Sequence, residues 1–121
     1  MSDRHWPLLV EDILECIGRI EQYVAGLQLD AFKASQITVD ATVRNLEIIG
    51  EASRNIPQDV KEAHPDLEWT KIVGLRNRVI HEYFGVDLDI IWRIIKEELP
   101  TLRDRMKNLL LPAAGEPDRS T

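Results

Sequence analysis

The sequence predicts an all-α fold, an antiparallel up-and-down bundle of four main helices with additional short helical turns. Three observations predict it. Apolar residues recur at spacings of three and four through most of the 121-residue chain. No segment alternates apolar and polar residues as a half-buried strand would. Proline and glycine fall between the periodic segments, where helices are expected to begin and end.

The first long helix is expected at about residues 7–25. Pro7 suits its first turn, where a missing N–H costs nothing, and Gly26 suits its end. The segment 27–34 that follows is expected to be a connector. The apolar face of the helix consists of Leu9, Ile13, Ile17 or Cys16, Ile20, Val24 and Leu27.

The second long helix is expected at about residues 35–55, and Pro57 ends it. Gly50 lies inside this helix at a cost of about 1 kcal/mol relative to alanine, which indicates close approach of a neighbouring helix. The expected apolar positions are Ile37, Ala41, Leu46, Ile49, Ala52 and Ile56. The expected solvated ion-pair face is formed by Arg44, Glu47, Glu51 and Arg54.

The second half of the chain predicts a short helical turn and loop at residues 57–65 and two further helices. The third main helix is expected to begin between residues 66 and 70 and to reach residue 81 or 82. A turn at residues 84–85 follows, and Asp87 suits the N-cap of the last helix. That helix keeps one apolar face as far as Leu109, so Pro100 is expected to kink it rather than end it.

Residues 1–111 are therefore expected to form one helical domain, with residues 112–121 as a flexible tail rich in proline, alanine, glycine and polar residues. The formal net charge of −6 argues against a protein that coats nucleic acid through a broad basic surface, although it allows a small cationic site. The single cysteine, Cys16, lies among apolar residues and is expected to be a buried, unreactive thiol.

The sequence also limits location and cofactors. Acidic residues interrupt the N-terminal apolar run, and no stretch is long enough to span a membrane, so a soluble cytoplasmic protein is expected. The three histidines, His5, His64 and His81, are scattered and show no ligand spacing. No metal and no other cofactor is expected.

One segment, residues 74–83, differs from the scaffold because it gathers hydrogen-bonding side chains of distinct chemistry. At about 100° per residue, Asn77 and His81 lie one turn apart on one stripe, and Arg76 and Tyr83 share a neighbouring stripe. Arginine binds phosphate through a forked pair of donors, and histidine exchanges protons near neutral pH. Asparagine can orient the imidazole or a phosphate oxygen, and tyrosine can stack on a base.

These residue types suit metal-independent cleavage of RNA, in which the neighbouring 2′-hydroxyl is a built-in nucleophile. The alternative is structural, because such residues near a helix end often cap carbonyls or pair with acids such as Glu82. The spacing alone leaves both interpretations open.

The motif Arg76-Asn77-x3-His81-x-Tyr83 resembles that of the HEPN superfamily, in particular its HepT-like branch. Residues 45–52 (NLEIIGEA) resemble the second-helix signature of the family, and residues 69–77 (WTKIVGLRN) resemble its approach to the active site. The resemblance covers about residues 5–111, and its weakest part is the segment 27–34.

This resemblance implies a ribonuclease toxin of a HepT/MntA-type (type VII-like) toxin–antitoxin pair, acting as a homodimer with its site in the cleft between two subunits. Arg76 and His81 would be the catalytic pair and Asn77 would orient the site. Arg76, Arg78 and Tyr83 would contact RNA. The implied partner is a minimal nucleotidyltransferase antitoxin of the MntA type, which would neutralise the toxin by adenylylating Tyr83. The alternative is a non-catalytic HEPN module that binds a nucleotide, RNA or the nucleotidyltransferase.

Overall fold

The computed structural model describes residues 5–84 and 87–111, and the side chains of all of these except residues 81–84. The predicted tail at residues 112–121 and the part of the predicted turn at Gly85 lie outside this range. The described residues form α-helices and one π-helical segment: α1 (Trp6–Val24), α2 (Leu29–Ala34), α3 (Gln36–Arg54), α4 (Gln58–Ala63), α5 (Trp69–Val73), α6 (Leu75–Phe84), α7 (Leu88–Arg93), η1 (Ile94–Glu98) and α8 (Leu99–Asn108).

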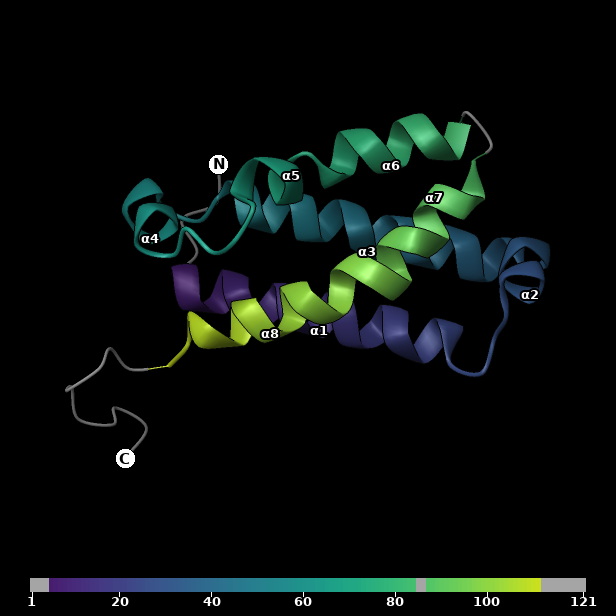
Figure 1. Ribbon diagram of the computed structural model, residues 1–121, viewed down its shortest axis with the longest axis horizontal. Coiled ribbons are helices and arrows are strands. Elements are labelled where there is room, and N and C mark those ends of the chain that lie inside the picture. The colour runs from purple at the N-terminus through teal and green to yellow at the C-terminus, as the bar shows by residue number, and fades with distance from the viewer. Residues whose placement is uncertain (1–4, 85–86, 112–121) are drawn as a thin grey trace.

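The long elements form the predicted antiparallel up-and-down bundle (Figure 1). α3 packs against α1 along one side and against α5 and α6 along another, while α8 returns alongside α1. The core is aliphatic; α1 and α3 supply much of it, and the α7–η1–α8 rod closes it. Fully buried side chains include Ile13, Ile17, Ile20, Leu46, Ile49, Ile91, Ile94, Leu99 and Met106. Burial of such side chains stabilises the fold by about 1.5–3 kcal/mol each.

The boundaries of α1 and α3 confirm the sequence prediction to within a residue. Pro7 lies in the first turn of α1, and Gly26 follows its end with φ 75°, a backbone conformation that favours glycine. At the start of α3, the Ser35 hydroxyl accepts a hydrogen bond from the backbone N–H of Thr38 at 3.3 Å. Cys16 is buried, as expected, and burial raises the pKa of its thiol.

Two predictions in this half were wrong. The segment 27–34 contains the helix α2, whose Phe32 is fully buried and packs against the Trp92 ring at a centroid distance of 5.1 Å. Six residues are too few to show a helical period, so the sequence pattern missed it. Ile37 is 84% exposed although its spacing fitted the apolar face of α3, because Val39 and Val43 fill the core at that end.

The other two main helices are each interrupted. The third is split into α5 and α6 at Gly74, and α6 continues to Phe84. The last keeps its predicted apolar face, but a π-helical segment, η1, precedes Pro100, with the backbone N–H of Leu99 bonded to the Ile94 carbonyl. Pro100 then falls in the first turn of α8, where its missing N–H is tolerated. Asp87 holds the N-cap position of α7 but makes no side-chain capping bond.

Candidate active site

The motif identified in the sequence begins in the first turn of α6, directly after the break at Gly74. The break is only one residue long. The backbone N–H of Gly74 bonds to the Thr70 carbonyl at 3.0 Å, and the N–H of Arg78 bonds to the Gly74 carbonyl at 3.0 Å. A Cβ at Gly74 would lie 3.1 Å from the Thr70 carbonyl oxygen, so a side chain there would require a small shift of the backbone between α5 and α6.

The close helix contact predicted at Gly50 is present, and it is made with the start of α6. A Cβ at Gly50 would lie 3.1 Å from the backbone nitrogen of Arg76 and 3.4 and 3.5 Å from the carbonyl oxygens of Val73 and Ile72. All three atoms belong to the backbone, which cannot turn aside as a side chain can. The bare backbone of α3 therefore sets the position of Arg76.

Arg76 and Asn77 are both exposed and lie together at the surface. They line a pocket of about 290 Å³, with Gly50, Arg54 and Thr70 among its other residues. On its other side Arg76 borders a wider hollow of about 760 Å³ between α1 and α3. The structure therefore brings two of the three predicted catalytic residues together and leaves them open to a ligand.

Arg78 points to a different part of the molecule. Two residues turn an α-helix by about 200°, and the Arg78 guanidinium makes a two-pronged contact with the Glu98 carboxylate of η1, at 3.2 and 3.0 Å. Lys71 of α5 lies 3.6 Å from the same carboxylate. The structure does not bring Arg78 to the side of Arg76, and its role in RNA binding stays a prediction.

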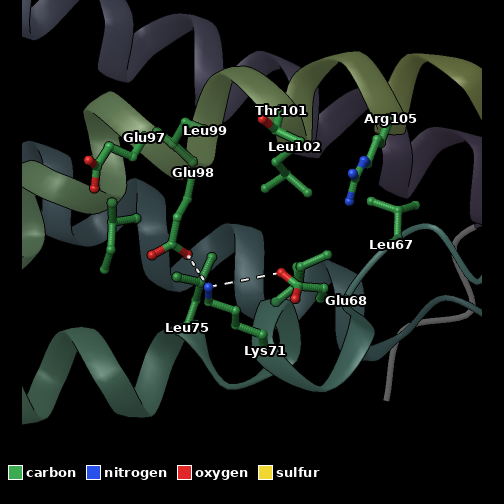
Figure 2. Close-up of a pocket in the computed structure, with 12 residues that line it drawn as sticks. Leu67, Glu68, Lys71, Leu75, Glu97, Glu98, Leu99, Thr101, Leu102 and Arg105 are labelled. Carbon is green, nitrogen blue, oxygen red and sulfur yellow. Dashed lines mark ion pairs between the residues drawn. The ribbon is translucent and has the colours of Figure 1, made fainter.

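Figure 2 shows the pocket of about 350 Å³ in which Glu98 lies, between α5 and the η1–α8 rod. Glu98 and Glu68 approach Lys71 from opposite sides, with the Glu68 pair at 3.9 Å. Burial alone would raise the pKa of Glu98, but the hydrogen bonds and charges of Arg78 and Lys71 outweigh it and hold that pKa below its usual value. Glu98 thus joins α5, α6 and η1 as a carboxylate.

Replacing Glu98 by glutamine is expected to destabilise the protein by about 1–2 kcal/mol at neutral pH, because charge-assisted bonds on a partly exposed carboxylate are lost. A lowered folded-state pKa stabilises the fold above the unfolded pKa, and this contribution is lost as pH falls through the folded value. The difference between wild type and Glu98→Gln should therefore shrink below about pH 4.5, the ordinary value for the group. This difference in unfolding free energy is measured by urea unfolding at a series of pH values, with circular dichroism as the signal.

The matched control for this prediction is Glu97→Gln. Glu97 is the neighbour of Glu98, but its pair with Arg93 is long, at 3.7 Å, and both side chains are 68% exposed. It should change stability by less than about 0.5 kcal/mol. Equal losses in the two variants, or a Glu98 effect that does not vary with pH, would contradict the argument.

His81 and Tyr83 lie in the C-terminal half of α6, and their side chains are outside the described residues. Their roles as catalytic and modified residues stay predictions. Within the part of the chain whose side chains are described, no cluster of three or more His, Cys, Asp or Glu is arranged to hold a metal ion. None of the helices among the described residues is long and apolar enough to cross a membrane.

The sequence did not indicate the surroundings of two side chains, Glu98 beside Arg78 and Arg54 in the pocket of Arg76. Glu98 pairs with a residue twenty positions away, and no local pattern signals that contact. Arg54 was assigned to an ion-pair face, yet no ion pair joins Arg44, Glu47, Glu51 and Arg54 within the described residues. The sequence did contain one indication of its position: Arg54 lies one helical turn beyond Gly50, on the face of α3 that meets α6.

Comparison with known proteins matches residues 13–109 to the family described as Ribonuclease HepT-like. A protein of Thermococcus cleftensis whose name contains the term ribonuclease HepT is 41% identical over 100 residues, covering 83% of this chain and 91% of the relative. Proteins of Caldanaerobacter subterraneus subsp. tengcongensis and Methanocaldococcus jannaschii, whose names contain the term RNase, are 41% and 37% identical. They cover 86% and 88% of this chain and 92% and 98% of their own. No solved structure matches.

Proposed function

The chain belongs to the ribonuclease HepT-like family, and on that premise we propose that it is a metal-independent endoribonuclease whose site is formed by Arg76, Asn77 and His81. The observation that carries the proposal is the placement of Arg76. Its backbone is fixed against Gly50 of α3, while its side chain is exposed beside Asn77. An arginine so placed is available to a phosphodiester, because its side chain is exposed in the pocket that it shares with Asn77.

In the proposed reaction, the 2′-oxygen of a ribose attacks the adjacent phosphorus and the bond from phosphorus to the 5′-oxygen breaks. Arg76 binds the phosphate and stabilises the charge that builds on its oxygens. His81 exchanges protons, taking one from the 2′-hydroxyl or giving one to the departing 5′-oxygen. Asn77 orients the imidazole or a phosphate oxygen. The products are a 2′,3′-cyclic phosphate and a 5′-hydroxyl.

We place this site in the cleft of a homodimer. One copy of α6 supplies a single histidine, whereas the reaction needs both a proton acceptor and a proton donor. A two-fold axis would supply a second set, so that one imidazole serves each proton transfer. Convergence of two copies also concentrates positive charge in a chain whose formal net charge is −6.

The test is RNA cleavage by the purified chain in the presence of EDTA, together with its oligomeric state by size-exclusion chromatography. Cleavage should persist in EDTA and leave 2′,3′-cyclic phosphate ends or their hydrolysis products. Loss of cleavage in EDTA would overturn the metal-independent mechanism. RNA binding without cleavage would favour the other candidate, a non-catalytic module, which is favoured by the excess of acids over bases.

We further propose that the enzyme is a cytoplasmic toxin, and that a minimal nucleotidyltransferase antitoxin neutralises it. The antitoxin would transfer the AMP group of ATP to the Tyr83 hydroxyl, with release of pyrophosphate. Tyr83 lies in the same helix as Arg76, about two turns further on. An AMP group on its hydroxyl adds negative charge and bulk near the cationic site. Both effects oppose RNA binding, so the modification is a physically sound off-switch.

Co-expression with the nucleotidyltransferase should add one or more AMP units to the chain, and the modified protein should lose RNA cleavage. Tyr83→Phe should fold normally, because only a hydroxyl is removed, and should show no such mass increment. Intact-mass spectrometry measures both. An unchanged mass with active partner and ATP would refute the proposal, and so would AMP found on Tyr83→Phe at the wild-type level.

A further inference from the structure

The pocket that holds Arg76 and Asn77 also contains Arg54, from the last turn of α3, and Thr70 of α5. We call this pocket the Arg54 groove; it is lined by Gly50, Glu51, Arg54, Thr70, Val73, Gly74, Arg76 and Asn77. Its floor is the seam between α3 and the α5–α6 segment, where Gly50 brings the two backbones together. The groove therefore holds Arg54 together with the proposed catalytic arginine.

The charge in this groove is positive, with two arginines against Glu51. The Arg54 side chain is exposed, and its guanidinium has no ion-pair partner within the described residues. Its backbone carbonyl accepts a hydrogen bond from Lys61 Nζ at 3.3 Å. The wider hollow on the other side of Arg76 is different, because four acids there outnumber three arginines. An anionic chain leaving Arg76 is favoured on the Arg54 side.

The spacing of the two arginines along the groove also suits a nucleic-acid strand. Gly50 lies level with Arg76, and Arg54 is one helical turn further along α3, about 6 Å by the rise of an α-helix. That distance is of the order of the spacing between successive phosphates in an extended strand. α3 and α6 run in opposite directions (Figure 1), so Arg54 and His81 lie on opposite sides of Arg76 along the seam.

Beyond Thr70 the surface continues into a second open hollow of about 460 Å³, which shares Thr70 and Val73 with the groove. Its lining includes Lys61 and Trp69, with Lys61 Nζ 5.9 Å from the centre of the Trp69 ring. A run of cations that ends beside an aromatic ring is typical of surfaces that bind single-stranded nucleic acid.

We propose that Arg54 binds the phosphate next to the scissile one, so that single-stranded RNA on the side away from His81 follows the Arg54 groove toward Lys61 and Trp69. This inference rests on the proposed ribonuclease function and adds the path of the substrate to it. Arg54 is a substrate-binding residue, whereas Arg76 acts on the reacting phosphate. Its loss therefore weakens RNA binding and raises KM, while kcat stays close to that of the wild type.

The first experiment measures binding without cleavage. The probe is a fluorescein-labelled single-stranded RNA of mixed sequence with 2′-O-methyl groups in place of the hydroxyl nucleophiles, and fluorescence anisotropy gives Kd over a salt series. Arg54→Ala should raise Kd roughly tenfold at low salt and reduce the slope of log K against log salt by about 0.7, the value for one phosphate contact on a single strand. Arg54→Lys should keep most of the salt dependence of binding, because lysine retains the positive charge.

The matched control is Arg93→Ala, which removes the same charge from α7, where Arg93 pairs with Glu97 outside the groove. It should change Kd by less than about twofold. Circular dichroism should show equal helix content in all variants. Equal Kd values and salt slopes for Arg54→Ala and Arg93→Ala would overturn the inference, as would failure of the wild type to bind the probe.

The second experiment separates this inference from the function on which it rests. With cleavable RNA, Arg54→Ala should raise KM and leave kcat within about twofold of wild type. If the wild type binds the probe through Arg54 but cleaves no RNA, the ribonuclease proposal fails and the binding groove stands. If the wild type cleaves RNA and Arg54→Ala matches it in KM and salt slope, the groove fails and the ribonuclease stands.

Discussion

Replacing His81 by alanine is expected to lower kcat/KM for RNA cleavage by about 10²–10⁴-fold, the range that general acid–base catalysis contributes. The 2′-hydroxyl is a weak nucleophile until a base removes its proton, and the 5′-oxygen is a poor leaving group until it receives one. No other histidine lies in α6, so the chain has no substitute there. Binding of the 2′-O-methyl probe should be nearly unchanged, because the loss is in the chemical step.

The companion variant, Arg76→Ala, is expected to lose about 10²–10³-fold in kcat/KM, because it removes donors that stabilise charge on the phosphate. Arg76→Lys should recover only part of this, since an ammonium keeps the charge but not the planar fork. The Arg76 side chain is exposed, so Arg76→Ala should fold with stability within about 0.5 kcal/mol of wild type.

Both losses are measured as initial rates on a fluorophore–quencher RNA in EDTA, with Arg93→Ala as the control preparation. Arg93→Ala should retain wild-type activity, because its side chain lies on α7 and pairs with Glu97. Wild-type rates in the His81→Ala preparation, with the Arg76→Ala preparation inactive, would remove His81 from the mechanism.

The sequence predicted the long helices well because each buries one face, and burial imposes a period of three and four residues. The same reasoning failed where the contacts are few. α2 contributes one fully buried aromatic side chain, Phe32, and one side chain gives no period. Ile37 fitted the period of α3, but whether a neighbour covers a helix end depends on where other helices stop. The break at Gly74 likewise reflects local packing that periodicity does not report.

Some of the surroundings of the candidate site could also be predicted. A glycine inside a helix indicates a close contact, and the structure shows it between Gly50 and the backbone of Arg76. Chemistry and spacing singled out Arg76 and Asn77, which line one pocket in the structure, and their catalytic roles stay predictions. The partner of Arg78 was not predictable, since Glu98 comes from a distant turn, and neither was the neighbourhood of Arg54. Such pairings depend on how the helices pack against one another. Local sequence patterns do not report that packing.

Gly50→Val is expected to destabilise the protein by about 3 kcal/mol, the upper end of typical overpacking costs. A Cβ at this position already meets the backbone nitrogen of Arg76 at 3.1 Å, and valine adds two further carbons directed at the same seam. Gly50→Ala is the milder step. Its gain in helix propensity, about 1 kcal/mol, is more than offset by the contact, so a net loss of about 1 kcal/mol is expected.

The matched control is Gly18→Ala, because Gly18 also lies inside a long helix but a Cβ there would meet nothing within 4 Å. Alanine at position 18 should stabilise the protein by about 0.5–1 kcal/mol. The two glycine-to-alanine changes thus have opposite expected signs in urea unfolding, and the difference isolates the contact from helix propensity. If both alanine variants were more stable than the wild type, α6 would be able to move away from α3 without a cost in stability.

Gly50→Val should also lower kcat/KM under conditions where the variant remains folded, by about 10²-fold if α6 moves by roughly 1 Å. The variant removes no group from the proposed chemistry, so such a loss would arise from position alone. This loss would distinguish a site whose geometry is fixed by the α3–α6 contact from a site that rearranges when substrate binds. A folded Gly50→Val variant with wild-type kcat/KM would show that the α3–α6 contact does not set the position of Arg76. Bound RNA or the partner subunit would then position this residue.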